Sequence, residues 1–214
     1  MLTLSFAPAF NAGLLLSLSL IMALGPQNAH VIRMGLQGQH VWLTIGVCIL
    51  SDALLIGLGV LGLAQLGGLS DTLKEILVGG GIVFLLIYGS QAFTRFRANT
   101  PVNPAMPTQQ TPSAISRRQA IGQALAFAWL NPHAWLDTTV LMGTASLAWS
   151  APANTVFGLG AATGSVLWFV SLGLCVLWLG PRLQSPAAWR ALDALVALMM
   201  WGTALVLAQG LLKL

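Results

Sequence analysis

The chain has 214 residues, of which 57% are hydrophobic and only 7% are charged, and its formal net charge is +4. A soluble domain carries about 25% charged residues, so this composition excludes an ordinary soluble globular protein. The positive charge does not indicate nucleic-acid binding, because the basic residues lie at the ends of apolar segments and in one polar segment, where they set the orientation of membrane proteins.

Six apolar segments are each long enough to cross a bilayer, which takes about 20 helical residues. They lie at about residues 7–31, 41–66, 73–94, 120–148, 153–180 and 190–211. The sequence therefore predicts an all-α, polytopic integral membrane protein with six transmembrane helices. The first segment is too long for the core of a signal peptide and no Lys or Arg precedes it, so we do not expect it to be removed.

The first segment contains a helix breaker followed by two amides, Pro26, Gln27 and Asn28. Proline lacks a backbone N–H and clashes with the carbonyl four residues earlier, here that of Met22. Unwound backbone at membrane depth is tolerated only where it is buried in protein or lines a cavity. The motif predicts either a simple proline kink or an unwound binding site.

The second segment carries a carboxylate, Asp52, near its middle, directly after Ser51. A charge at the bilayer centre costs on the order of 3 kcal/mol, so an intramembrane acid indicates a binding or proton-carrying site. A protonated Asp bonded to a neighbouring helix is the structural alternative. No Lys or Arg lies at similar depth, so a cationic substrate or a proton would supply the neutralising charge. The acids Asp71, Glu75 and Asp193 lie near segment ends, where we expect water to reach them.

Two glycine patterns are interpreted as helix-packing contacts. Gly57-x-Gly59-x-x-Gly62 has no strand-to-helix context, so it does not indicate nucleotide binding. Gly160-x-x-x-Gly164 has the spacing of small residues at close helix contacts, either within the chain or between subunits. A homo-oligomer therefore stays open.

Residues 96–119 are rich in Pro, Thr, Gln and Ser, and cannot bury enough apolar surface to fold alone. We interpret them as a flexible cytoplasmic linker. It separates a first three-helix half, residues 1–95, from a second, residues 120–214.

The fourth segment repeats the combination of a breaker, an amide and an acid in Asn131, Pro132, His133 and Asp137. Here the proline frees the carbonyl of Ala128. His133 and Asp137 are four residues apart and share a helical face if the helix resumes after the proline. This spacing suits a proton-coupling pair, and equally a structural hydrogen bond. It also suits two metal ligands, but too few further ligands are near, so no metal site is predicted.

The two halves are faintly similar. Residues 85–90 (LLIYGS) recur as residues 198–203 (LMMWGT), 113 positions later, and Pro26 and Pro132 are 106 positions apart. Because each half has three spans, two similar halves would sit in opposite orientations. The sequence therefore predicts an inverted 3+3 repeat, which is typical of secondary transporters that bind substrate where the halves meet.

Loop charges predict the orientation of the chain. With six spans, seven basic residues share one side, which the rule for Lys and Arg places in the cytoplasm, so both termini face outward. These residues are Arg33, Arg95, Arg97, Arg117, Arg118, Arg182 and Arg190; Lys74 and Lys213 lie on the other side.

The stretches LGPQNAHVIRMG, LSDALLIGLGVLGL, WLNPHAWLDT and WLGPRL, in this order, resemble the LysE family of amino-acid exporters, and look most like its arginine-exporting branch. The resemblance implies a multi-pass protein of the bacterial inner membrane that exports basic amino acids. It also implies that Asp52 and Asp137 match the family's intramembrane aspartates. The matches to its proline motifs are Pro26, Gln27, Asn28, Asn131 and Pro132.

Together these features predict a secondary transporter, not an enzyme, that exports basic L-amino acids (arginine, and also lysine) by proton antiport. The expected partners are the substrate, protons and lipid, with no cofactor. The alternatives are an exporter of another amino acid or of a divalent cation, a channel, and a non-transporting anchor or sensor. The substrate-binding candidates are Gln27, Asn28, Ser51, Asp52, Asn131 and Asp137. The proton-coupling candidates are Asp52, His133 and Asp137, and the helix breaks are at Pro26 and Pro132.

Overall fold

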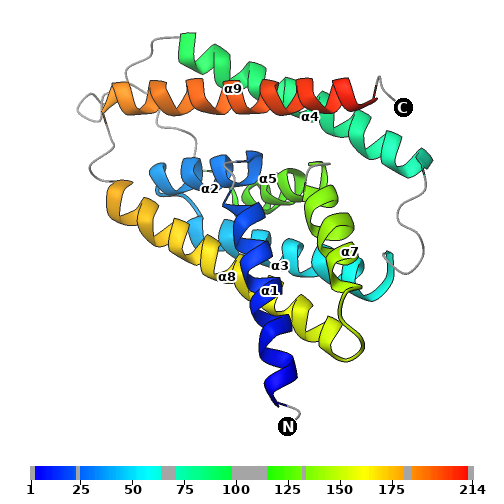
Figure 1. The fold of residues 1–214 in the computed structure, drawn as a ribbon. Helices are drawn as coiled ribbons and strands as arrows, with labels where there is room; N and C mark the ends of the chain where they lie inside the picture. Colours follow the sequence, from blue (N-terminus) through cyan, green and yellow to red (C-terminus); the bar gives the residue numbers. More distant parts are fainter. Residues whose placement is uncertain are drawn as a thin grey trace.

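The computed structural model describes residues 3–22, 25–63, 71–97, 115–131, 134–180 and 185–211. Within these ranges every regular element is a helix, which confirms the all-α fold class. Two elements, η1 and η2, are π-helical and continue or precede an α-helix. The elements in chain order (Figure 1) are α1 (Thr3–Ile21), α2 (Pro26–Leu36), α3 (Val41–Leu58), η1 (Gly59–Leu63), α4 (Asp71–Arg97), α5 (Arg117–Trp129), η2 (Trp135–Leu141), α7 (Met142–Ser146), α8 (Ala153–Leu179) and α9 (Pro186–Leu211).

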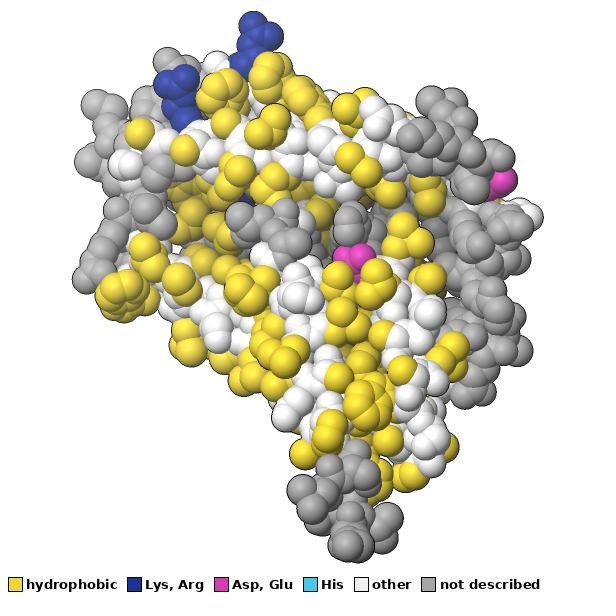
Figure 2. Space-filling model, in the orientation of Figure 1, with side chains coloured by type: hydrophobic (Ala, Val, Ile, Leu, Met, Phe, Trp, Pro, Cys, Tyr) yellow, Lys and Arg dark blue, Asp and Glu magenta, His cyan; other side chains and the backbone are white. Residues whose placement is uncertain are grey.

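Three helices in the described part of the chain are long and apolar enough to cross a bilayer: Val41–Gly62, Ala153–Leu179 and Trp189–Gln209. A fourth span results if Phe6–Ile21 and Pro26–Leu36, which are bent by 72° relative to each other, form one broken span. Figure 2 shows apolar side chains spread over one face of the molecule, as expected for a surface in contact with lipid. The count of six spans and the inverted repeat stay predictions.

The predicted linker is partly helical at both ends. Helix α4 continues to Arg97, and α5 begins at Arg117, three residues before the predicted second half. A capping box fixes the start of α5: Ser116 Oγ accepts from the Gln119 N–H at 3.2 Å, and Gln119 Oε1 accepts from the Ser116 N–H at 3.0 Å. The rest of the linker, residues 98–114, lies outside the described residues.

Helices α4 and α9 run side by side in opposite directions across the remaining helices (Figure 1). A buried apolar cluster joins this pair to α2 and α5, with Leu85 and Met200 at its centre and Phe127 of α5 packed against them. Two further clusters hold the rest together. One comprises Ala9, Ile56, Val60, Met142, Phe157 and Ala161, and the other Val31, Val41, Ile45, Cys48 and Phe169.

Helices α1 and α8 meet backbone to backbone. A Cβ added at Gly13 would clash with the carbonyl oxygen of Phe157, and one added at Gly160 would clash with that of Phe10. At Gly164 an added Cβ would lie 2.9 Å from the Oγ of Ser17. The Gly160-x-x-x-Gly164 pattern is therefore an internal helix contact.

Only one glycine of the other pattern lies at a close contact. A Cβ at Gly59 would clash with the carbonyl oxygen of Thr139, whereas one at Gly57 or Gly62 would meet nothing within 4 Å among the described residues. The packing interpretation is thus right for Gly59, which brings η1 against η2.

Candidate functional site

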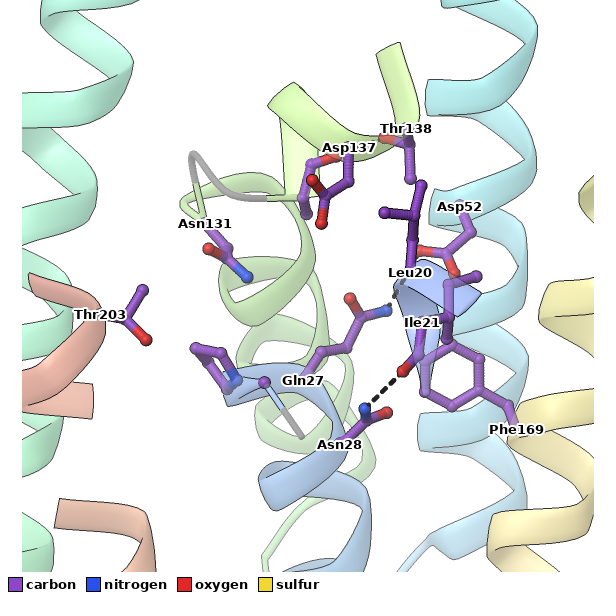
Figure 3. A pocket seen from close by; sticks show the side chains of 13 residues that line it. Leu20, Ile21, Gln27, Asn28, Asp52, Asn131, Asp137, Thr138, Phe169 and Thr203 are labelled. Atoms are coloured by element: carbon purple, nitrogen blue, oxygen red, sulfur yellow. Dashed lines mark hydrogen bonds between the residues drawn. The ribbon is translucent and has the colours of Figure 1, made fainter. Parts of the chain in front are cut away.

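The two helix breaks border one cavity of about 150 Å³ near the middle of the molecule (Figure 3). It lies between the start of α2, the middle of α3 and the segment that joins α5 to η2, and one residue of α9 closes its far side. Most of the predicted site residues line this cavity, although they come from both halves of the chain. They are Pro26, Gln27, Asn28, Asp52, Asn131 and Asp137.

The break between α1 and α2 is held by the side chain of Asn28. Its Nδ2 donates to the carbonyl oxygen of Ile21 at 2.8 Å, and its Oδ1 accepts from Trp168 Nε1 at 3.1 Å. The carbonyl that this amide satisfies lies one residue before the one that the proline rule predicts, Met22. Because both ends of the amide are engaged, Asn28 joins the start of α2 to the end of α1 and to α8.

Helix α2 begins at the cavity without a side-chain cap. Gly25 is its N-cap and has no side chain to cap the first turn, and Pro26 is its first helical residue. The first N–H groups of a helix have no intrahelical acceptor. The N–H groups of Gln27 and Asn28 and the positive end of the α2 dipole therefore lie beside the cavity.

The second break, between α5 and η2, is closed by a backbone carbonyl and an indole. The carbonyl of Asn131 accepts from the N–H groups of Ala134 at 3.1 Å and Trp135 at 3.4 Å. Trp135 Nε1 donates to the carbonyl of Trp129 at 2.9 Å. Trp129 follows Ala128, whose carbonyl was predicted to lose its helical hydrogen bond. Pro132 and His133 lie outside the described residues.

Asp52 is only 3% exposed and is bound by neutral donors. Gln27 Nε2 donates to its Oδ1 at 3.3 Å, and Ser165 Oγ donates to its Oδ2 at 2.8 Å. The first donor comes from the start of α2 and the second from the middle of α8. Since neither donor carries charge, the carboxylate has no cation beside it among the described residues.

Asp137 is half-buried on η2 and borders two hollows. One is the cavity, and the other is an open hollow on the outer side of η2 and α7, which Val140 and Thr144 also line. Near its middle, the face in Figure 2 shows acidic side-chain atoms among apolar ones. Thr139, two residues on, donates from Oγ1 to the carbonyl of Leu55 at 3.2 Å and ties η2 to α3.

The described lining of the cavity holds two carboxylates and no basic side chain. Two negative groups facing one space repel each other unless a cation or a proton joins them. The described residues contain no group of three or more His, Cys, Asp or Glu side chains that would hold a metal ion. The cavity therefore suits a ligand that carries positive charge.

Ser51 does not line the cavity within the described residues. Its Oγ accepts from Trp129 Nε1 at 3.1 Å and so links α3 to α5. Seven described lining residues were not predicted: Leu20, Ile21, Gly25, Ala134, Thr138, Phe169 and Thr203. Phe169 is one apolar residue within an apolar segment, so no pattern distinguishes it. Thr203 ends the repeated segment at residues 198–203. A small polar residue in that apolar segment is the sequence feature that could have identified it as a candidate lining residue.

Comparison with known proteins gives one family and a set of close relatives. A family model described as LysE type translocator matches residues 18–210. The chain is 38% identical over 201 residues to the "Arginine exporter protein ArgO" of Pectobacterium carotovorum, covering 94% of this chain and 96% of the relative. It is 37% identical over 198 residues to the protein of the same name from Escherichia coli K12, covering 92% of each chain. No solved structure matches the chain.

Proposed function

The chain belongs to the LysE family of translocators, and on that premise we propose that it exports basic L-amino acids, arginine and also lysine, in exchange for protons. It is a multi-pass membrane transporter and not an enzyme. We place it in the inner membrane of a bacterium. The relatives are named as arginine exporters, which supports arginine as the first substrate to test.

One observation carries this proposal: Asp52 and Asp137, from the two halves of the chain, line the same cavity beside a broken helix. The cavity lining that the structure describes includes no basic side chain, and the two donors that bind Asp52 are both neutral. A cationic amino acid neutralises the Asp52 carboxylate while it is bound. When the amino acid is released, the carboxylate again lacks a cation.

The α-carboxylate of the amino acid needs donors, and the start of α2 offers them. The uncapped first turn of a helix binds anions through its free N–H groups and its dipole. Gly25 has no side chain to compete for them, and the backbone can approach the ligand closely there. We therefore assign the carboxylate to the amino-terminal end of α2, at the N–H group of Gln27 and the positive end of the helix dipole. The sequence suggested a second such terminus after Pro132, which lies outside the described residues.

We assign the cationic side chain of the substrate to the Asp52 carboxylate. Its two neutral donors hold the carboxylate in place without cancelling its charge. A guanidinium group binds a carboxylate with two parallel hydrogen bonds, and an ammonium binds it as a point charge. Phe169, which also lines the cavity, offers an aromatic face, and such faces attract guanidinium more often than ammonium.

Charge movement favours exchange over uniport. Moving one positive charge outward against 100 mV costs about 2.3 kcal/mol. One proton moving inward for each monocation moving outward cancels that cost. We assign proton exchange to Asp137, because it borders both the cavity and the open hollow beside η2. His133 stays a candidate partner in this step.

The inverted repeat is part of the proposal, and helix contacts support it. Gly89 of α4 packs on Trp201 of α9, where an added Cβ would lie 2.6 Å from Trp201 Cδ1. These residues lie in the two similar segments, at nearly equivalent positions. Two helices related by a twofold axis meet at equivalent residues, so this contact is where such an axis would pass.

The test is transport of labelled arginine and lysine in sealed, everted membrane vesicles with an imposed proton gradient. We expect gradient-dependent uptake of both, and loss of arginine uptake by at least 100-fold in Asp52→Asn and in Asp137→Asn. Normal rates in both variants would refute the exchange mechanism. Uptake of neutral amino acids or of a divalent cation in place of arginine would refute the substrate assignment.

A further inference from the structure

Three charged side chains from three different helices form a cluster away from the cavity. Arg33 Nη1 of α2 and Arg95 Nε of α4 both contact Asp193 Oδ1 of α9, at 3.0 Å and 3.1 Å. The Asp193 side chain is 12% exposed. This differs from the expectation that Asp193 lies in water near a segment end, because the two arginines cover it.

The cluster is incompletely paired. Two positive groups share one negative group, and within the described residues each arginine contacts the same oxygen, Asp193 Oδ1, through one nitrogen. Nη2 of Arg95 is buried and has no acceptor among the described residues. The Arg95 guanidinium is oriented by Tyr88, whose ring centroid lies 5.8 Å from its Cζ. The cluster thus contains the Asp193 carboxylate, on which a substrate cation can replace an arginine. It also contains a hydrogen-bond donor, Arg95 Nη2, that has no acceptor among the described residues.

The cluster lies at the basic end of the molecule and is connected to the cavity through α2. At this end the turn between α2 and α3 contacts the start of α5: His40 Nε2 lies 2.9 Å from the Ile115 carbonyl. Along α2, Gln27 reaches Asp52 and Arg33 reaches Asp193. Six residues of helix separate these two contacts, about 9 Å. The Arg95 side chain is 33% exposed, so the cluster borders the surface, although Arg95 Nη2 itself is buried.

We propose that Asp193 and Arg95 form an exchange site that takes a cationic amino acid before it reaches the cavity. The side-chain cation of the substrate replaces Arg33 on the Asp193 carboxylate, and the α-carboxylate accepts from Arg95 Nη2. Displacing Arg33 frees α2, whose first turn borders the cavity. Arg33 therefore competes with the side-chain cation of the substrate for the Asp193 carboxylate. This inference rests on the proposed function, because it requires a cationic amino acid as cargo.

The kinetics of arginine uptake into everted vesicles test the competition. Asp193→Asn removes the acceptor of the cation and is expected to raise the KM for arginine by about tenfold, the effect of losing one charge-assisted hydrogen bond. Arg33→Gln removes the competitor and is expected to lower the KM. The two variants break the same ion pair, so a purely structural clamp predicts that the KM moves in the same direction in both. That outcome would overturn the proposal.

A matched control is Arg190→Gln. Arg190 is an exposed arginine on α9, three residues before Asp193; its Cζ lies 5.5 Å from the Phe96 ring, and no salt bridge joins it to Asp193 among the described residues. Its removal changes the local charge equally and should leave the KM within about twofold. If it lowers the KM as much as Arg33→Gln, general electrostatics explain the effect and the exchange site is wrong. Arg33→Lys, a weaker competitor for the carboxylate, should shift the KM the same way by less and serves if Arg33→Gln does not fold.

Agmatine, which is arginine without its carboxylate, tests the second contact. Arg95→Gln should weaken the inhibition of uptake by unlabelled arginine by about tenfold, as for the loss of one charge-assisted hydrogen bond, and should not weaken inhibition by agmatine, since it also removes one cation from Asp193. Equal weakening of both would overturn the role of Arg95. A wild-type protein that takes up no arginine refutes the proposed function itself, whereas active wild type with parallel KM shifts refutes only the exchange site.

Discussion

Ser165 of α8 donates a hydrogen bond of 2.8 Å to Asp52 of α3, and the two residues are 113 positions apart. This is the spacing that separates the similar segments at residues 85–90 and 198–203. If the halves are related by a twofold axis, the contact lies on that axis. The intramembrane carboxylate would then stand where the two halves face each other, with the hydroxyl as its counterpart in the second half.

The hydrogen bond from Ser165 and the charge of Asp52 can be separated experimentally. Ser165→Ala removes one neutral donor and leaves the carboxylate, so we expect arginine transport to fall by about tenfold at most, in line with a hydrogen bond worth about 1 kcal/mol. Asp52→Asn keeps the shape and removes the charge, and transport should be lost. Initial rates of uptake, normalised to the amount of protein in the membrane, measure both. Equal losses would mean that Asp52 acts as a structural acceptor.

Asn28 should matter for stability as well as for transport. Asn28→Ala leaves the Ile21 carbonyl and the Trp168 indole N–H without their partner, which costs about 1–3 kcal/mol for a buried group. Thermal unfolding of the purified protein in detergent measures the loss. Ser19→Ala is the control, since Ser19 Oγ donates to the Leu16 carbonyl on an exposed part of α1. A similar loss in both variants would contradict the role given to Asn28.

Glycine substitutions test the contact between α1 and α8. Gly160→Ala places a methyl group against the Phe10 carbonyl, and overpacking of this kind costs about 1–3 kcal/mol or more. Gly46→Ala adds the same methyl group where nothing lies within 4 Å. Both substitutions gain the same helix propensity, so the difference between their unfolding temperatures reports the contact alone. A Gly160→Ala protein as stable as Gly46→Ala would show that the helices separate easily.

Charge balance gives a prediction that needs no mutation. If one proton is exchanged for one monocation, an imposed potential of about 100 mV should change the rate of arginine exchange by less than about twofold. Uniport would be opposed by about 2.3 kcal/mol, which is a factor of about 50. Proteoliposomes with a potassium gradient and valinomycin allow the comparison at fixed pH. A strong dependence on potential would rule out one-for-one exchange.

Sequence reasoning located the cavity through residues whose placement within a membrane helix has a high free-energy cost, because such residues indicate a functional site. Asp52, Asp137 and Pro26 are unfavourable within apolar helices, and all three border the cavity. Such a cost is visible in a single chain because it depends on the residue type and its depth alone.

What the sequence could not indicate depends on contacts between distant residues. Arg33 and Asp193 are 160 positions apart, so the ion pair that buries Asp193 is invisible without the fold. Phe169 faces the cavity only because of the rotation of α8 about its axis, which an evenly apolar segment leaves undetermined. Ser51 precedes Asp52 and was expected to share its role, but successive residues on a helix point about 100° apart, and its hydroxyl meets Trp129.

The bare main-chain contact between α1 and α8 limits how this molecule can change shape. Packed side chains can switch rotamers to let one helix slide on another, whereas carbonyl groups pressed against Gly13 and Gly160 leave no deformable layer between the axes. We therefore expect α1 and α8 to move together as one rigid unit during a transport cycle. We expect bending to occur at the 72° break between α1 and α2, so that α2 moves relative to the α1–α8 pair.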